Sequence, residues 1–124
     1  MADYRELSQV YANEAIKAVS VLNGGAALAL LTQTSDLVEA KLGDIYFSPM
    51  CWWTAGLVIA TLLWTFAFAS TRYVDKGERE NDAAHISKSN LWMYAALFGF
   101  FISVVCFAVG AVTLALGVAK MTLP

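Results

Sequence analysis

Residues 89–119 read SNLWMYAALFGFFISVVCFAVGAVTLALGVA and contain no charged side chain. As a helix this run extends for about 45 Å, which exceeds the hydrocarbon core of a bilayer, about 30 Å thick. Two further uncharged runs, 45–71 and 18–35, have 27 and 18 residues. A spanning helix needs about 20 mostly apolar residues, so the shortest run is at the margin. The three runs predict three spans, at about 18–35, 50–71 and 91–119.

The composition excludes an ordinary soluble domain. Hydrophobic residues make up 59% of the 124 residues, and charged residues make up 15%. A typical soluble domain has about 25% charged residues, and a soluble chain this short buries only about two thirds of its surface. Backbone in lipid must pair its own N–H and C=O groups, and these runs do not alternate as barrel strands do. We therefore predict an all-α integral membrane protein, a single membrane domain over 1–124 with three transmembrane helices.

The segments between the spans carry their own signals. Residues 3–17 lead into the first span without Gly or Pro, so one long helix is expected. Asp36 and the acid three residues later make a capping box, and Gly43 can end a helix. These signals predict a short surface helix over 36–47, between spans one and two. Residues 72–90 hold four bases and four acids and are expected to form a polar loop.

The ends of the second span are marked by a proline and by aromatic side chains. Pro49 is expected to begin this helix, since proline fits the first helical turn. Trp52 and Trp53 lie near that end and Tyr73 near the other. Such residues are typical of the two membrane–water interfaces, so we predict an aromatic belt there.

Orientation follows from the distribution of Lys and Arg. The N-terminus and segment 72–90 lie on one side of the membrane and carry six of these residues, while segment 36–49 and the C-terminus carry two. Since cytoplasmic segments are enriched in Lys and Arg, we predict a cytoplasmic N-terminus and an external C-terminus.

The third span carries a stripe of small residues at alternating separations of three and four. The stripe consists of Ala96, Gly99, Ser103, Cys106, Gly110, Thr113 and Gly117. Small side chains let another helix approach closely, which drives helix association in lipid. We expect this stripe to contact another chain; the alternative is packing against the first two spans of the same chain.

The first span has small residues and one strongly polar side chain. Ser20 and Gly24 are four residues apart, as are Gly25 and Ala29, and both pairs favour close helix packing. Asn23 can form a hydrogen bond between helices, which is the preferred interpretation, or it can line water.

A polar lumen is the alternative role for this asparagine. Thr54, Thr61 and Thr65 share a face of the second span, although Thr hydroxyls in membranes usually bond back to their own helix. The candidate lumen residues are therefore Asn23, Thr54, Thr61 and Thr65.

The run Leu22-Asn-Gly-Gly-Ala-Ala27 resembles the first helix of small, uncharacterised bacterial multi-span membrane proteins. The resemblance covers about ten residues. It implies a bacterial membrane protein, which we expect in the inner membrane, and brings no activity with it.

Several chemistries are set aside. His85 is the only histidine, so one chain cannot form a bis-histidine haem site or a His-rich metal site. Cys51 near the outer interface and Cys106 in mid-membrane are expected to lie too far apart for a disulfide. Arg79 and His85 are spaced similarly to the catalytic pair of HEPN ribonucleases, but a solvated loop is the better interpretation. We predict no catalytic residue, no cofactor and no metal ion.

Charge narrows the function further. A net charge of −2 without a basic stripe argues against a nucleic-acid partner. Spans two and three contain no ionisable residue of the kind that coupled transport usually needs, and the nearest candidates, Glu14 and Lys17, are expected at the interface. Three classes remain: a self-assembling protein that forms a ring or pore, such as a holin-like or toxic effector; an accessory subunit of a larger membrane complex; and a membrane enzyme, for which no residue set is recognisable. The preferred hypothesis is a non-enzymatic protein that contacts lipid and copies of itself, with other membrane subunits as the alternative partners.

The six-to-two distribution of Lys and Arg makes a testable prediction of topology. A reporter that is active only outside the cytoplasm, fused after Pro124, should be active. An inactive reporter there, together with an active one inserted at 72–90, would show the opposite orientation.

Overall fold

A computed structural model describes residues 4–122 of the chain; Asp3, the first residue of the predicted N-terminal helix, and Pro124 lie outside the described residues. The elements are α1 (Tyr4–Thr32), α2 (Thr34–Glu39), α3 (Gly43–Glu80) and α4 (Ala83–Thr122). All regular structure within residues 4–122 is helical, which confirms the all-α fold. α1, α3 and α4 are each long and apolar enough to cross a membrane, so the chain is a multi-pass membrane protein.

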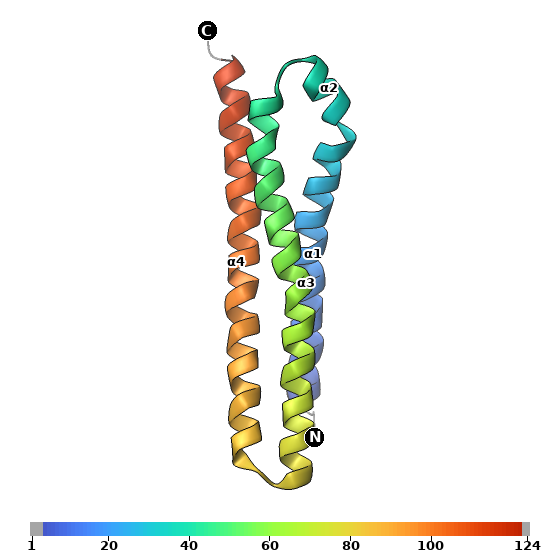
Figure 1. Cartoon of the computed structure of the whole chain (residues 1–124), viewed down its shortest axis with the longest axis vertical. Coiled ribbons are helices and arrows are strands. Elements are labelled where there is room, and N and C mark those ends of the chain that lie inside the picture. The colour runs from blue at the N-terminus through green and yellow to red at the C-terminus, as the bar shows by residue number, and fades with distance from the viewer. Residues whose placement is uncertain (1–3, 123–124) are drawn as a thin grey trace.

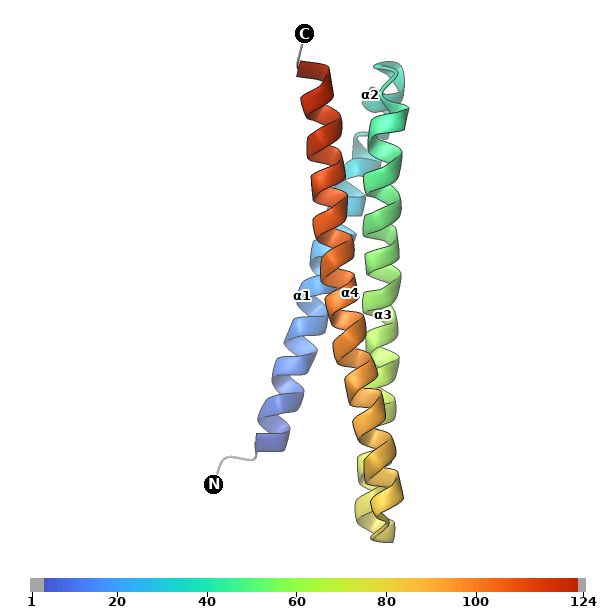
Figure 2. The same cartoon turned by 90° about the vertical axis from the view of Figure 1, so that its left-hand side faces the viewer.

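Figure 1 shows α3 and α4 as an antiparallel hairpin that runs the length of the molecule, with α1 alongside. The start of α1 and the α3–α4 turn lie at one end, the N-terminal end of the bundle, and α2 and the end of α4 lie at the other, the C-terminal end. Figure 2 shows that α1 lies close to the hairpin in its second half and leans away toward its N-terminus. In agreement, the side chains of residues 6–12 are all exposed.

The core lies where α1 crosses the hairpin. One cluster joins Ile16 and Val19 of α1 to Ala60 and Leu63 of α3. The other cluster, nearer the C-terminal end of the bundle, consists of Ala27, Leu30 and Trp53, with Phe107 and Leu114 of α4 among the side chains packed against it. Both clusters use residues three or four apart on α1, so a single helical face makes the contact.

The predicted polar loop over 72–90 is wrong, because helices replace it. α3 continues to Glu80 and α4 begins at Ala83, so the turn between them is only Asn81 and Asp82. Asn81 has a left-handed backbone with φ 50°, and the N–H of Asp82 donates to the carbonyl of Gly77. This is a Schellman ending, with Asn as one of the few residues that adopt the left-handed region readily. The Asp82 carboxylate then accepts from the N–H of Ala84 and begins α4.

Hydrogen bonds between Ser70 and Ser89 connect α3 and α4 at the point where their apolar runs end. Ser89 Oγ donates to the carbonyl of Ser70 at 3.0 Å, and the two hydroxyls lie 3.0 Å apart. Further out along the hairpin, Gly77 leaves room for Ile86 and His85, whose side chains occupy the space that a larger residue would need. The charged segment is therefore a packed helical hairpin that projects beyond the apolar part of the bundle.

A short helix does occupy the other connection, but with different bounds. α2 covers Thr34–Glu39, and Gln33, not Asp36, is its N-cap, without a side-chain cap bond. Gly43, expected to end a helix, is the first residue of α3. The reversal takes place at Lys41, whose φ of 59° is left-handed. A surface helix over 36–47 is thus not confirmed.

The second span also begins earlier than expected. α3 starts at Gly43 and continues through Pro49, which is buried inside the helix. Trp52 faces outward with 41% exposure, whereas Trp53 is 6% exposed and belongs to the core. Only one of this tryptophan pair is therefore free to join an interfacial belt.

Hydrogen exchange tests the projecting hairpin. In lipid nanodiscs, the backbone amides of 72–80 and 86–90 should exchange slowly, because they are bonded within helices that pack on each other. The amides of 6–12 serve as an internal control, since that part of α1 is helical but unpacked and should exchange faster. If the amides of 72–90 exchange as fast as those of an unstructured chain, the segment is a loop and not a helical hairpin.

Candidate functional site

Asn23 is the centre of a polar node in which all three long helices meet. Its side chain is fully buried. Its amide Nδ2 donates to the carbonyl of Val19 at 3.0 Å and lies 3.2 Å from both the carbonyl and the hydroxyl of Ser103. Ser103 Oγ in turn donates to the carbonyl of Gly56 at 2.9 Å. The node thus connects α1 to α4 and α4 to α3, deep inside the bundle.

Gly56 makes this node geometrically possible. A Cβ on Gly56 would overlap Asn23 Oδ1, so only glycine leaves space for the amide. Among the described residues, no hydrogen-bond donor reaches that oxygen. Asn23 Oδ1 therefore lies against the backbone of Gly56, whose Cα–H group can form a weak contact with it.

Sequence reasoning found Asn23 and Ser103 but missed Gly56. The signal was present, since Gly56 and Ala60 are four residues apart and form a third small pair on the face that α3 turns to its neighbours. The preferred interpretation of Asn23 as a bond between helices agrees with this geometry. The node fills the crossing of the helices, so Asn23 does not line water within the described residues.

The small-residue stripe of α4 faces α3 of the same chain. A Cβ on Gly99 would meet Leu63, one on Gly110 would overlap the indole of Trp53, and one on Gly117 would overlap Ile45. Ser103 and Cys106 are buried between these positions, and Thr113 bonds back to the carbonyl of Gly110. Each glycine receives a large side chain of α3.

Trp53 shows how closely the two helices approach. Its ring stacks on Phe107 with centroids 6.4 Å apart, and its Nε1 donates to the carbonyl of Phe107 at 3.1 Å. The indole N–H is thereby satisfied without water, as a site inside lipid requires. Within this chain the stripe is occupied, which is the alternative that the sequence left open.

The small residues of α1 divide into two groups. Ser20 bonds back to the carbonyl of Ile16, and a Cβ on Gly24 would touch Leu57 of α3 at 3.4 Å, so both face the bundle. A Cβ on Gly25, in contrast, would meet no neighbouring side chain within 4 Å. Gly25 and Ala29 are exposed on the outer surface of α1.

The structure does not bring the candidate lumen residues together. Thr54, Thr61 and Thr65 are exposed on the outer surface of α3, whereas Asn23 is in the core. Thr61 donates to the carbonyl of Leu57 at 2.9 Å, as threonines in membrane helices usually do. A lumen would therefore have to form between chains and would not include Asn23.

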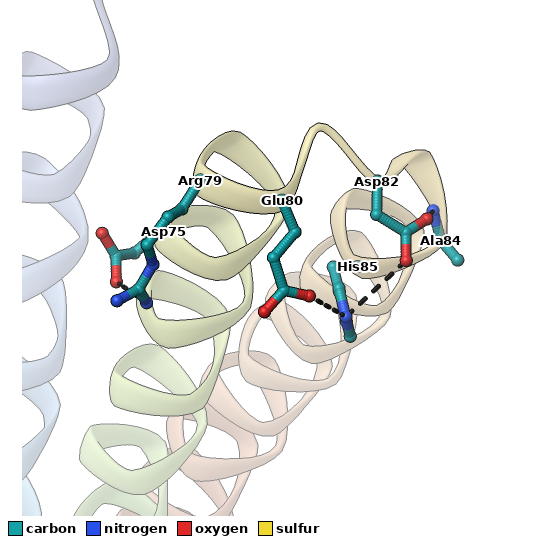
Figure 3. A network of polar contacts seen from close by, with 6 residues as sticks. All are labelled: Asp75, Arg79, Glu80, Asp82, Ala84 and His85. Carbon is teal, nitrogen blue, oxygen red and sulfur yellow. Dashed lines mark hydrogen bonds and ion pairs between the residues drawn. The ribbon is translucent and has the colours of Figure 1, made fainter.

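The tip of the α3–α4 hairpin holds a second polar cluster, shown in Figure 3. Arg79 pairs with Asp75 at 2.9 Å, one helical turn earlier. His85 Nε2 lies 3.3 Å from Glu80 and 3.7 Å from Asp82, and its ring stacks on Tyr73. Arg79 and His85 thus have separate partners, and the pair does not form a ribonuclease-like centre.

Metal and disulfide chemistry find no support in the part of the chain that the structure describes. No group of three or more His, Cys, Asp or Glu side chains there is arranged to hold a metal ion. Cys51 is exposed and Cys106 is buried, and both are free thiols. Comparison of the chain with known protein families, with curated proteins and with solved structures found no match.

A double-mutant cycle tests the Asn23–Gly56 contact. Gly56→Ala should destabilise the bundle, because the new methyl group displaces the Asn23 amide from its acceptors. In an Asn23→Ala background the same change should be much less harmful, giving a coupling of about 1–3 kcal/mol in unfolding experiments in detergent. Gly25→Ala is the matched control and should leave stability unchanged or slightly raised. Additive effects of the two core substitutions would show that they do not share a site.

Proposed function

We propose that this chain is a non-enzymatic membrane protein that works by self-association, with its N-terminus in the cytoplasm of a bacterium. The observation that carries the proposal is the outward-facing Gly25 in the middle of the first span. Glycine weakens a helix and gives lipid little to contact, so a glycine without a neighbour in its own chain is best explained by a helix from another chain.

The open surface of the spans supports the same proposal. At most 28% of the residues in any of the three apolar windows are buried within the chain. Most of each span is therefore left for contact with lipid or with another protein. A single chain presents a stable three-helix bundle with wide surfaces left for association.

A pore is the more specific form of this proposal. The exposed Thr54, Thr61 and Thr65 form a mildly polar line along α3, which copies arranged in a ring can turn toward a shared lumen. This arrangement fits a holin-like or toxic effector that permeabilises its membrane.

The projecting hairpin favours a second candidate function. Its exposed Arg72, Asp75 and Arg79 stand outside the apolar part of the bundle on a rigid pair of helices. An accessory subunit would use such a hairpin as the contact with a soluble part of a larger complex.

Reconstitution of the purified full-length chain separates these functions. Self-association predicts that fluorescently labelled protein in liposomes shows several bleaching steps per particle and contains no other protein. A pore adds dye release, which Thr61→Leu and Thr65→Leu should reduce without changing the step count. Monomers at high density, with partners that co-purify from the native membrane, would favour the accessory subunit. Oligomers in liposomes that release no dye would support self-association and contradict the pore.

A further inference from the structure

Glu14 and Lys17 form an ion pair on the outer surface of α1. Lys17 Nζ donates to Glu14 Oε1 at 2.6 Å, and the two side chains are 56% and 62% exposed, respectively. Neither side chain has an acidic or basic partner on α3 or α4 among the ion pairs of the described residues. The pair therefore lies on the side of α1 that no other helix of the chain covers.

The depth of this pair follows from the register of the helices. Asn23 lies level with Ser103 and Gly56, because they share the polar node. Ser103 is next to the midpoint of the uncharged run 89–119, and Gly56 is two residues from the midpoint of 45–71. The node thus marks the middle of the apolar part of the bundle.

The backbones of Lys17 and Glu14 lie on the N-terminal side of this middle level. They precede Asn23 by six and nine residues, which corresponds to about 9 Å and about 14 Å along a helix. Half of a hydrocarbon core is about 15 Å thick, and the lean of α1 shortens the rise along the membrane normal further. Since Lys17 Nζ reaches Glu14 Oε1, both charges lie near the level of Glu14, just inside the edge of the hydrocarbon.

The neighbouring helices keep their charges much further out. On the same side, Lys88 of α4 is 15 residues from Ser103, and Arg72 of α3 is 16 residues from Gly56. These separations correspond to about 22–24 Å. The ion pair on α1 is thus some 10 Å deeper than the first charge on either neighbour.

A lipid-facing ion pair at this depth is unusual. Ionisable residues inside membrane spans nearly always face other helices or a water-filled cavity, since lipid cannot solvate their charge. Within this chain the ion pair faces no other helix, because the exposed face of α1 points away from α3 and α4. A helix from another chain that covers this face would separate the charges from lipid.

The surface around the pair carries small residues at a regular spacing. Glu14, Lys17, Ala18, Val21 and Leu22 line a shallow hollow. Small residues recur every seven positions on this side, at Ala18, Gly25 and Thr32, and all three are exposed. Val21 and Leu28, which are 71% and 61% exposed, stand between them. A repeat of seven is the spacing of two helices that pack along their length.

We propose that a second copy of this chain docks on this face of α1, through Ala18, Val21, Gly25 and Leu28, and shares the charges of Glu14 and Lys17. The inference rests on the proposed self-association and adds its surface and its partner. Two copies inserted in the same membrane have the same orientation, so their α1 helices run parallel and Glu14 and Lys17 of both copies meet at one height. Each copy supplies one acid and one base, and the four side chains form a neutral cluster removed from lipid.

Steric substitutions test the face. Gly25→Leu adds a large side chain where no neighbour in the chain would meet it, so the monomer should fold and insert while dimerisation measured by energy transfer in liposomes weakens about tenfold or more. Ala108→Leu is the matched control, because it makes a similar change on the exposed surface of α4. It should leave dimerisation unchanged.

Charge substitutions test the partner. Glu14→Lys places four bases at the contact between two identical copies, and Lys17→Glu places four acids there, so each variant alone should dimerise poorly. Mixed in one membrane, the two variants restore a neutral cluster and should form heterodimers. The double substitution E14K/K17E should likewise regain dimerisation, since the charges have only exchanged places.

The outcomes distinguish this inference from the function on which it rests. Wild-type protein that stays monomeric at high density overturns both. Oligomers that persist in Gly25→Leu overturn the α1 surface and leave self-association through another face. Failure of the mixed charge variants to associate, with each inserted in the membrane, overturns the shared ion pairs.

Discussion

An asparagine amide inside a bilayer has to find its hydrogen-bond partners on protein, and the positions of all three spans follow from where Asn23 finds them. Its amide reaches the carbonyl and hydroxyl of Ser103, and that hydroxyl reaches the carbonyl of Gly56. A shift of one residue in any helix would separate these atoms and leave polar groups unpaired in an apolar medium, at a cost of several kcal/mol. Apolar clusters lie on both sides of the node and add contacts between α1 and the hairpin.

The α3–α4 hairpin uses a different principle, in which large side chains of one helix enter gaps on the other. Leu63, Trp53 and Ile45 stand opposite Gly99, Gly110 and Gly117, so the large residues of α3 meet a glycine of α4 at successive levels. Association in lipid depends on this close fit, because lipid tails are as apolar as leucine and no hydrophobic gain is available. The glycines therefore bring two helices of one chain together, and the outward surfaces are left to α1 and to the outer side of α3.

The sequence established the spans because lipid imposes a simple demand on length and charge. It misplaced their ends for a physical reason: a charge marks where the membrane stops, whereas a helix stops where its last carbonyls are capped. Arg72 and Lys88 ended the apolar runs, yet the helices continue to the reversal at Asn81. The small residues of α4 predicted close packing but not the helix that packs on them. That helix is α3, because Trp53 and Leu63 face the glycines of α4 across the hairpin. The sequence predicted Glu14 and Lys17 at the interface, and their level relative to the charges of α3 and α4 emerges only when Asn23 is aligned with Ser103.

The bond between Asn23 and Ser103 joins residues 80 positions apart in the chain. During synthesis at about 5–20 residues per second, the first span therefore waits roughly 4–16 s before its acceptor has been made. Throughout that interval a span of marginal hydrophobicity holds an amide without its final partner, so it depends on the insertion machinery or on water at the membrane surface. A chain interrupted before α4 keeps only the bond from this amide to the Val19 carbonyl of its own helix, because both acceptors on Ser103 are missing.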